Sequence, residues 1–199
     1  MRQHSLAIIA ALAAAGFAAC SQAATIVTFA DPAMGPSTPL FEVNSNTGIL
    51  TGSWTASGLT LQTPGLAAAD LVDARFVMSA VALLSPLPFA TLGPGQIDFW
   101  DSANALQMTI TFSGGLLSSS FGFGSSEFQG NNVTFSGPIL GGTVLNQEAF
   151  AFSFANPSAT QFGYQATASF TSSATIVPAP AGLAALGMGC MGIARRRRR

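Results

Sequence analysis

The chain has 199 residues, 49% of them hydrophobic, and a formal net charge of −1 at pH 7. All eight acidic residues lie between Asp31 and Glu148, whereas Arg75 is the only base between residues 25 and 177, so this region carries one positive charge against eight negative ones. A net charge of −7 excludes nucleic-acid binding through phosphate contacts. The same region has no Lys, His or Cys, which excludes His- or Lys-based nucleophile sites and the usual zinc sites.

The first predicted element is an export signal. Arg2 supplies a positive start, residues 6–19 form an uninterrupted apolar run, and a small-x-small cleavage pattern ends at Ala23. We predict that signal peptidase cuts after Ala23 or Ala24. An alternative interpretation is a lipoprotein signal in which Cys20 becomes acylated.

The hydrophobic pattern that follows has a period of two, which is typical of half-buried strands. In the clearest run, 106–112, one face is predicted to carry Leu106, Met108, Ile110 and Phe112. The pattern predicts about ten short strands, at 25–29, 48–54, 59–63, 70–78, 96–100, 106–112, 116–123, 132–136, 149–155 and 165–172. Residues typical of turns separate them, at 44–48, 63–65, 93–95, 113–115, 137–138 and 156–157.

Many short strands without intervening helices predict an all-β fold, an antiparallel two-sheet sandwich or jelly roll. We expect three parts along the chain: a signal peptide at 1–23, a β-sandwich ectodomain at 24–174 and a C-terminal tail at 175–199. A signal helix and a C-terminal hydrophobic helix are expected to flank the ectodomain.

The chemistry left to the ectodomain is that of carboxylates. Asp70 with Asp73, and Asp98 with Asp101, share a D-x-x-D spacing, and the remaining candidate acids are Glu127 and Glu148. The simplest interpretation is that these acids cap turns and solvate loops. Calcium held by the two Asp pairs is one alternative, because hard cations prefer oxygen ligands. A glycosidase pair of carboxylates is another alternative.

Three aromatic residues are candidates for glycan contact: Trp54, Trp100 and Tyr164. An aromatic side chain offers an apolar face to a sugar ring and a polar edge beside it. Large aromatic residues of a β-domain also pack in its core. The sequence leaves both roles open for these three residues.

The C-terminal tail has three parts in a fixed order. Val177, Pro178, Ala179 and Pro180 favour an extended backbone, because proline fixes φ and biases the residue before it. An apolar run at 181–194 follows, and its 14 residues would span about 21 Å as a helix, short of a bilayer core of about 30 Å. The chain then ends in a basic cluster that is expected to stop translocation: Arg195, Arg196, Arg197, Arg198 and Arg199.

Residues 175–199 resemble the PEP-CTERM sorting domain of Gram-negative bacteria, which combines a Val-Pro-Glu-Pro-like motif, a short apolar helix and an Arg cluster. Ala179 stands where that family usually has Glu. The resemblance implies that an exosortase, a membrane-embedded Cys-dependent transpeptidase, cuts at the motif and releases the protein or attaches it at the cell surface. An ordinary short C-terminal anchor is the alternative.

The resemblance also implies a link to exopolysaccharide and biofilm systems. We therefore expect an exported, non-catalytic structural or matrix-associated protein that is held transiently at the inner membrane and later reaches the cell surface or the extracellular space. One alternative is a carbohydrate-binding module, with or without calcium. Another is a glycan hydrolase that uses carboxylates alone. No cofactor is expected apart from the calcium alternative.

Overall fold

The computed structural model of the chain describes residues 23–35, 37–118 and 126–177. These residues form twelve strands of one antiparallel sheet and a single 3-10 turn, with no α-helix in the ranges given. The prediction of an all-β antiparallel domain is confirmed. The strands are β1 (Ala23–Phe29), β2 (Phe41–Asn44), β3 (Ile49–Trp54), β4 (Arg75–Ala82), β5 (Phe89–Leu92), β6 (Gly95–Trp100), β7 (Leu106–Phe112), β8 (Gly114–Ser118), β9 (Ser126–Asn131), β10 (Thr134–Ser136), β11 (Val144–Thr160) and β12 (Gly163–Val177), and the turn is η1 (Pro138–Leu140).

The sheet curls until its strand pairs form a closed circuit. Six strands join in sequence to form three longer, bent strands: β5 with β6, β7 with β8, and β9 with β10. Only one or two residues separate the two strands within each pair. Gly95 opposite Phe112 and Leu92 opposite Gly115 keep the same register through one of these bends. The pairing leads from β4 through the three bent strands to β11, β12, β2, β3 and back to β4.

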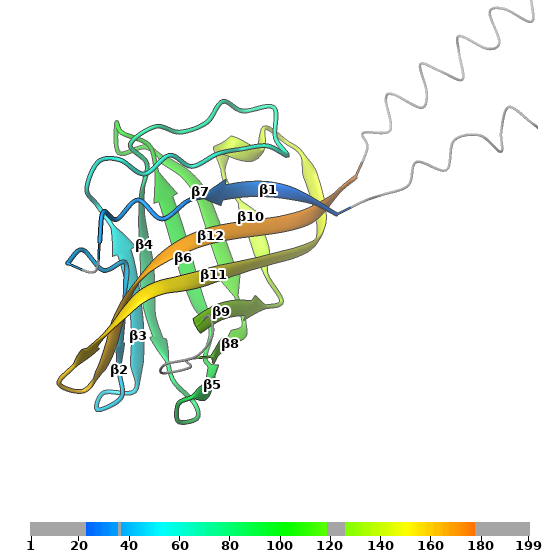
Figure 1. The fold of residues 1–199 in the computed structure, drawn as a ribbon. Helices are drawn as coiled ribbons and strands as arrows, with labels where there is room; N and C mark the ends of the chain where they lie inside the picture. The colour runs from blue at the N-terminus through cyan, green and yellow to red at the C-terminus, as the bar shows by residue number, and fades with distance from the viewer. Residues whose placement is uncertain (1–22, 36, 119–125, 178–199) are drawn as a thin grey trace, which may run out of the picture.

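The sheet curls round on itself (Figure 1), and buried phenylalanine rings form much of the core inside it. Phe99 of β6 lies 5.5 Å from Phe170 of β12, and Phe112 of β7 lies 5.4 Å from Phe150 of β11, between ring centroids. These contacts join strands that are far apart in the sheet order. The half formed by β4, β6 and β7 therefore faces the half formed by β1, β12 and β11 across an aromatic core.

The expected turns at 93–95 and 113–115 are bends within continuing strands, not chain reversals. At Gly95 a Cβ atom would collide with the Phe112 ring and lie 2.7 Å from Val81 Cγ2, so glycine lets these two buried side chains pack against the backbone. The expected turn at 156–157 lies inside β11, where Asn156 has φ 49° and the register with β12 shifts. It is a β-bulge, because one strand gains a residue that its partner lacks.

The strand pattern differs from the prediction in three further ways. β11 and β12 span 17 and 15 residues and are not short. The predicted strand at 59–63 and the first part of 70–78 form only isolated bridges, such as Leu61 with Leu71. β2, β5 and β9 were not predicted. The predicted run at 116–123 continues past the end of β8 at Ser118 into residues outside the described part.

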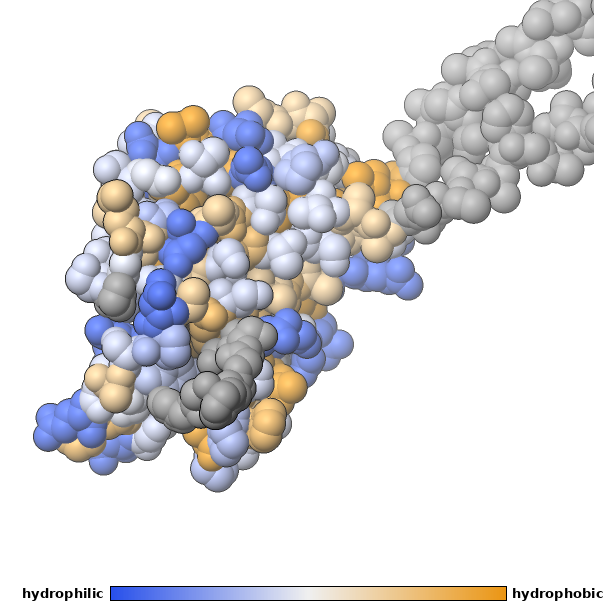
Figure 2. Space-filling model, in the orientation of Figure 1, coloured by the Kyte–Doolittle hydropathy of each residue, from blue (hydrophilic) through white to orange (hydrophobic). Residues whose placement is uncertain are grey.

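The two ends of the described domain lie side by side. Ala23, the first residue of β1, pairs with Thr175 near the end of β12, and both strand ends lie at one end of the molecule (Figure 1). β12 continues to Val177, three residues beyond the expected ectodomain boundary at 174. Val177 pairs with Val144, which is 60% exposed. On the face drawn in Figure 2, apolar residues form small groups among polar ones.

Candidate functional site

Asp70 and Asp73 hold the segment that joins β3 to β4. One carboxylate oxygen of Asp70 accepts hydrogen bonds from the backbone N–H of Thr63 at 2.8 Å and from its hydroxyl at 3.2 Å. Asp73 accepts from the backbone N–H of Gly58 at 2.7 Å. The two acids of this D-x-x-D pair therefore bind different parts of the same segment, which is a turn-capping role.

Asp101 organises the turn between β6 and β7. Its Oδ1 accepts the backbone N–H groups of Ala103 and Ala105, both at 2.9 Å, and its Oδ2 accepts the Gln107 amide at 2.7 Å. The hydrogen bond from Ala105, supported by those from Gln107 and Ala103, lowers the pKa of Asp101 against a smaller opposing effect of burial. The structure thus favours the ionised carboxylate at this turn.

Asp98 lies on β6 and differs from Asp101 in its surroundings. Both of its carboxylate oxygens accept from the Gln96 amide, at 2.9 and 2.8 Å, and Oδ1 also accepts the Thr109 hydroxyl at 2.6 Å. These partners are side chains of β6 and of the neighbouring β7. Asp98 belongs to a polar network on the sheet surface, whereas Asp101 belongs to a backbone turn.

Glu127 and Glu148 lie on different strands and have different partners. Glu127 of β9 accepts the Gln129 amide at 2.7 Å, and Glu148 of β11 accepts the backbone N–H of Phe135 at 3.3 Å. Within the described ranges, no three residues of the His, Cys, Asp and Glu types come together as a group that could hold a metal ion.

The three aromatic candidates have different environments. Trp54 and Tyr164 are buried, at 6% and 1% exposure. The indole N–H of Trp54 is buried and finds no acceptor among the described residues. Trp100 is only half-buried. Its strand alternates buried Ile97 and Phe99 with outward residues, and Trp100 has the outward parity. Of the three, Trp100 is therefore the one with the largest exposed surface.

Leu106 is not on the buried face, which corrects the prediction for 106–112. Phe99 pairs with Met108 but Trp100 pairs with Leu106, so Gln107 is an extra residue on β7. A bulge of this kind reverses the alternation of side chains beyond it. Leu106 is consequently 44% exposed and lies opposite Trp100.

Two partly exposed apolar residues, Val77 and Leu106, share the outer face of β4, β6 and β7 with Trp100. Trp100 pairs with Arg75 on one side and Leu106 on the other, and Val77, the next outward residue of β4, pairs with Asp98. Val77 is 41% exposed. We call Val77, Trp100 and Leu106 the Trp100 platform. Strand parity could have indicated Val77 from the sequence, whereas the bulge that exposes Leu106 left no clear sequence signal.

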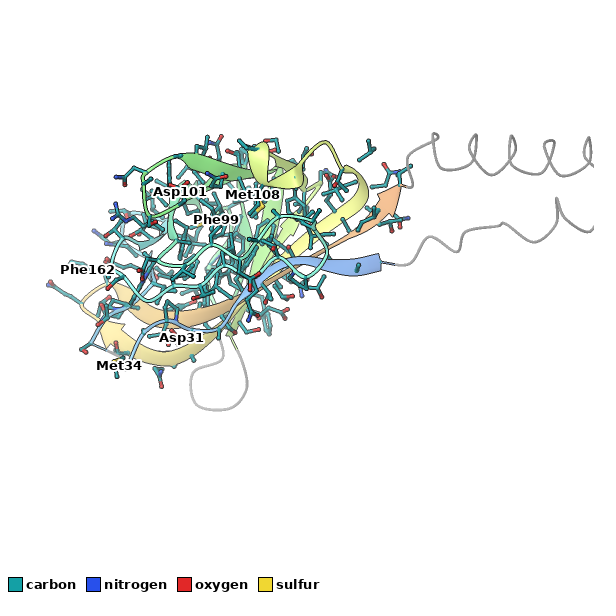
Figure 3. The ribbon with its side chains drawn as sticks, turned by 90° about the horizontal axis from the view of Figure 1, so that it is seen from above. Asp31, Met34, Phe99, Asp101, Met108 and Phe162 are labelled. Atoms are coloured by element: carbon teal, nitrogen blue, oxygen red, sulfur yellow. The ribbon has the colours of Figure 1, made fainter. Side chains whose placement is uncertain are left out.

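Polar side chains border the platform in three hydrogen-bonded groups. These are Asp98 with Gln96 and Thr109, Asp101 with Gln107, and the Arg75 guanidinium, which donates to the Asn104 side chain. Figure 3 shows Asp101 near Phe99 and Met108, the paired core residues of β6 and β7. The surface thus combines an apolar centre with amide, hydroxyl and carboxylate groups held in place.

The predicted processing positions are only partly within the described residues. Ala23 and Ala24 are the first two residues of β1, and Val177 is the last residue of β12. The lipidation candidate Cys20, the motif residues Pro178, Ala179 and Pro180, and the cluster at 195–199 lie outside the described part.

No protein-family model, curated protein or solved structure matches the chain. In the described part of the chain, none of the structure's elements is a helix with the length and apolar character needed to cross a membrane. The predicted membrane segment at 181–194 lies outside these residues.

Proposed function

We propose that the chain is an exported, non-catalytic protein of the cell surface or extracellular matrix, carried by a C-terminal sorting tail. The tail order supports this proposal: a Val-Pro-Ala-Pro motif, a short apolar run and five arginines. In this view a signal helix and a hydrophobic C-terminal helix flank a sandwich-like β-domain. An exosortase-type transpeptidase removes the tail and leaves the domain at the surface or releases it.

The observation that carries the proposal is the pairing of Ala23 with Thr175. The proposed signal cleavage, after Ala23 or Ala24, would fall at the start of β1, and the proposed sorting motif begins at Val177, the last residue of β12. A domain whose two ends lie together can fold while either end is still held at a membrane. Removal of either segment then leaves the closed circuit of strands intact.

A non-catalytic role agrees with the groups available. The ectodomain has no Lys, His or Cys to serve as base or nucleophile. Its candidate acids Asp70, Asp73 and Asp101 accept backbone N–H groups of turns, which is a structural task. Asp98 and Glu127 accept side-chain amides of their own strands.

Intact-mass analysis of the protein isolated from the cells that export it tests the proposal. We expect an N-terminus at Ala24 or Thr25 and a C-terminus within a few residues of 177–180, with any added mass reporting covalent attachment. A matched variant, Pro178→Ala with Pro180→Ala, should keep its tail and stay in the membrane fraction. Wild-type surface protein that still ends in Arg199 would refute sorting by this tail.

A further inference from the structure

We infer that the Trp100 platform binds an uncharged polysaccharide, which makes the protein a glycan-binding component of the matrix. The inference rests on the proposed function and adds a ligand class and a site to it. The platform extends across β4, β6 and β7, a width of two strand spacings or about 10 Å. It lies on an outer face of the sheet, so it suits a long polymer that crosses the strands.

The chemistry of the platform matches a sugar ring. The exposed part of Trp100, with Leu106 beside it, offers apolar contact to the C–H face of a pyranose. Hydroxyl groups at the ring edge need donors and acceptors at the border of that contact. Gln107 keeps its amide oxygen as an acceptor after donating to Asp101, and carboxylate oxygens can each accept more than one hydrogen bond.

The border groups are already fixed before any ligand arrives. Asp98 is held by Gln96 and Thr109, and Gln107 is held by Asp101, which is itself fixed by backbone N–H groups. Side chains with a single arrangement lose little conformational entropy on binding. The groups that organise the β6–β7 turn are therefore also available to sugar hydroxyl groups without being reordered.

The charge of the protein selects an uncharged ligand. Asp98 and Asp101 border the platform and Arg75 is the single base beside it. The whole region from 25 to 177 carries a charge of −7, from eight acids and one base. Its field repels uronic acid or sulfated polymers, and the repulsion is strongest at low ionic strength.

The platform is too small and too mixed to favour a protein partner. Stable protein interfaces bury about 800 Å² on each side and have a largely apolar centre. Here three partly exposed apolar side chains, Val77, Trp100 and Leu106, are interrupted by the carboxylate of Asp98. Burying that carboxylate against protein would require a matching base. A hydrated polysaccharide leaves it in contact with water.

The inference is tested by measuring how the host-processed protein binds neutral polysaccharides. The neutral polymers are soluble dextran, β-1,3-glucan, galactomannan and the neutral fraction of the host's own exopolysaccharide, and alginate is the anionic comparison. Affinity electrophoresis gives the dissociation constants. We expect binding to at least one neutral polymer and about tenfold or greater loss in Trp100→Ala. Trp100→Tyr should restore most of the affinity. Phe162→Ala is the matched control, because Phe162 is 46% exposed and lies away from Asp101 (Figure 3).

Leu106→Asp provides a second variant that does not depend on the fold tolerating the loss of Trp100. It places a charge on a side chain that is already 44% exposed, and we expect a loss of about tenfold or more with an unchanged thermal midpoint. Wild-type protein that binds none of the neutral polymers overturns the inference. So do preferential binding to alginate, unchanged affinity in both variants, and self-association that Trp100→Ala abolishes. None of these results affects the intact-mass test, so failure of the glycan site and failure of the sorting proposal are distinguishable.

Discussion

Replacing Phe152 by alanine tests whether the aromatic core holds the two halves of the sheet together. Phe152 is fully buried at the centre of the core, and its ring contacts are spread over several strands. Ring centroids lie 4.8 Å away for Phe41 and 4.9 Å for Phe170, and others lie at 5.9–6.1 Å: Phe29, Phe76, Phe128 and Phe150.

The expected loss follows from burial and from the cavity left behind. A buried aromatic side chain removes about 150–250 Å² from water, worth about 4–6 kcal/mol at about 25 cal/mol per Å². Alanine keeps part of this area, and measured Phe→Ala costs in cores are about 3–5 kcal/mol. Rings anchored on separate strands cannot all collapse into the hole at Phe152. We therefore expect a loss of about 4 kcal/mol, out of a total stability of about 5–15 kcal/mol.

Thermal and urea unfolding of the processed protein measure this loss. A domain of this size should lose about 2–4 °C for each kcal/mol, so Phe152→Ala should melt about 8–16 °C lower than wild type. Phe89→Ala makes the same chemical change on a side chain that is 69% exposed, and it should cost less than about 1 kcal/mol. Similar midpoints for Phe152→Ala and wild type would show that this ring does not hold a packed core.

Three other measurements probe the sheet and its carboxylates. Trypsin should not cut the native ectodomain, because Arg75 begins β4 and the next residue, Phe76, is fully buried. Denatured protein should give two fragments. Rapid cleavage of the native protein would contradict the assignment of β4. Asp101→Asn should lower the free energy of unfolding near neutral pH, because the ionised carboxylate stabilises the fold. The difference in this free energy from wild type should disappear as the pH falls below 3.8 and through the lowered pKa of Asp101. A difference independent of pH from 7 to 2 would refute this role. Melting curves in calcium chloride and in EDTA should superimpose, because Asp98 and Asp101 already accept protein donors; a clear rise in the midpoint with calcium would show a cation site.

The sequence predicted the class of fold because buried residues alternate along most strands. The strands that escaped prediction lack this signal. In β5, Phe89 is exposed and Ala90 is buried, which reverses the hydrophobic order. In β9, Phe128 is the core residue of an otherwise polar segment. Such strands form because their neighbours offer free backbone groups, and a single segment's pattern does not contain that information.

Turn residues could be located from the sequence, but their effect on the chain direction could not. Pro94 and Gly95 interrupt one long strand at a bend, and Asn156 with Pro157 interrupts another at a bulge. Proline removes one N–H donor and glycine permits close approach in a bend as well as in a reversal. Only the registers on either side, which depend on distant partners, distinguish the two.

The candidate site could likewise be predicted only in part from the sequence. Trp100 was visible in the sequence as a glycan-contact candidate, and Asp98 and Asp101 were visible as calcium or carboxylate-pair candidates. Parity with Ile97 and Phe99 places Trp100 outward. Trp54 has the buried parity of its own strand, but from the sequence we treated the two tryptophans as equal candidates. Tyr164 is buried as well, at 1% exposure. Whether a tryptophan is buried depends on whether its side of the strand faces the inside or the outside of the curled sheet.

The closed curl also determines how the platform relates to the two chain ends. Ala23 and Val177 belong to the half of the sheet formed by β1, β11 and β12, whereas Trp100 lies on the outer face of β4, β6 and β7. The two halves face each other through contacts such as Phe99 with Phe170, so the outer face of one half points away from the other. A domain held by its ends therefore keeps the platform exposed. Glycan binding should consequently be the same before and after tail removal, and the Pro178→Ala, Pro180→Ala variant should bind neutral polysaccharide as tightly as the processed protein does.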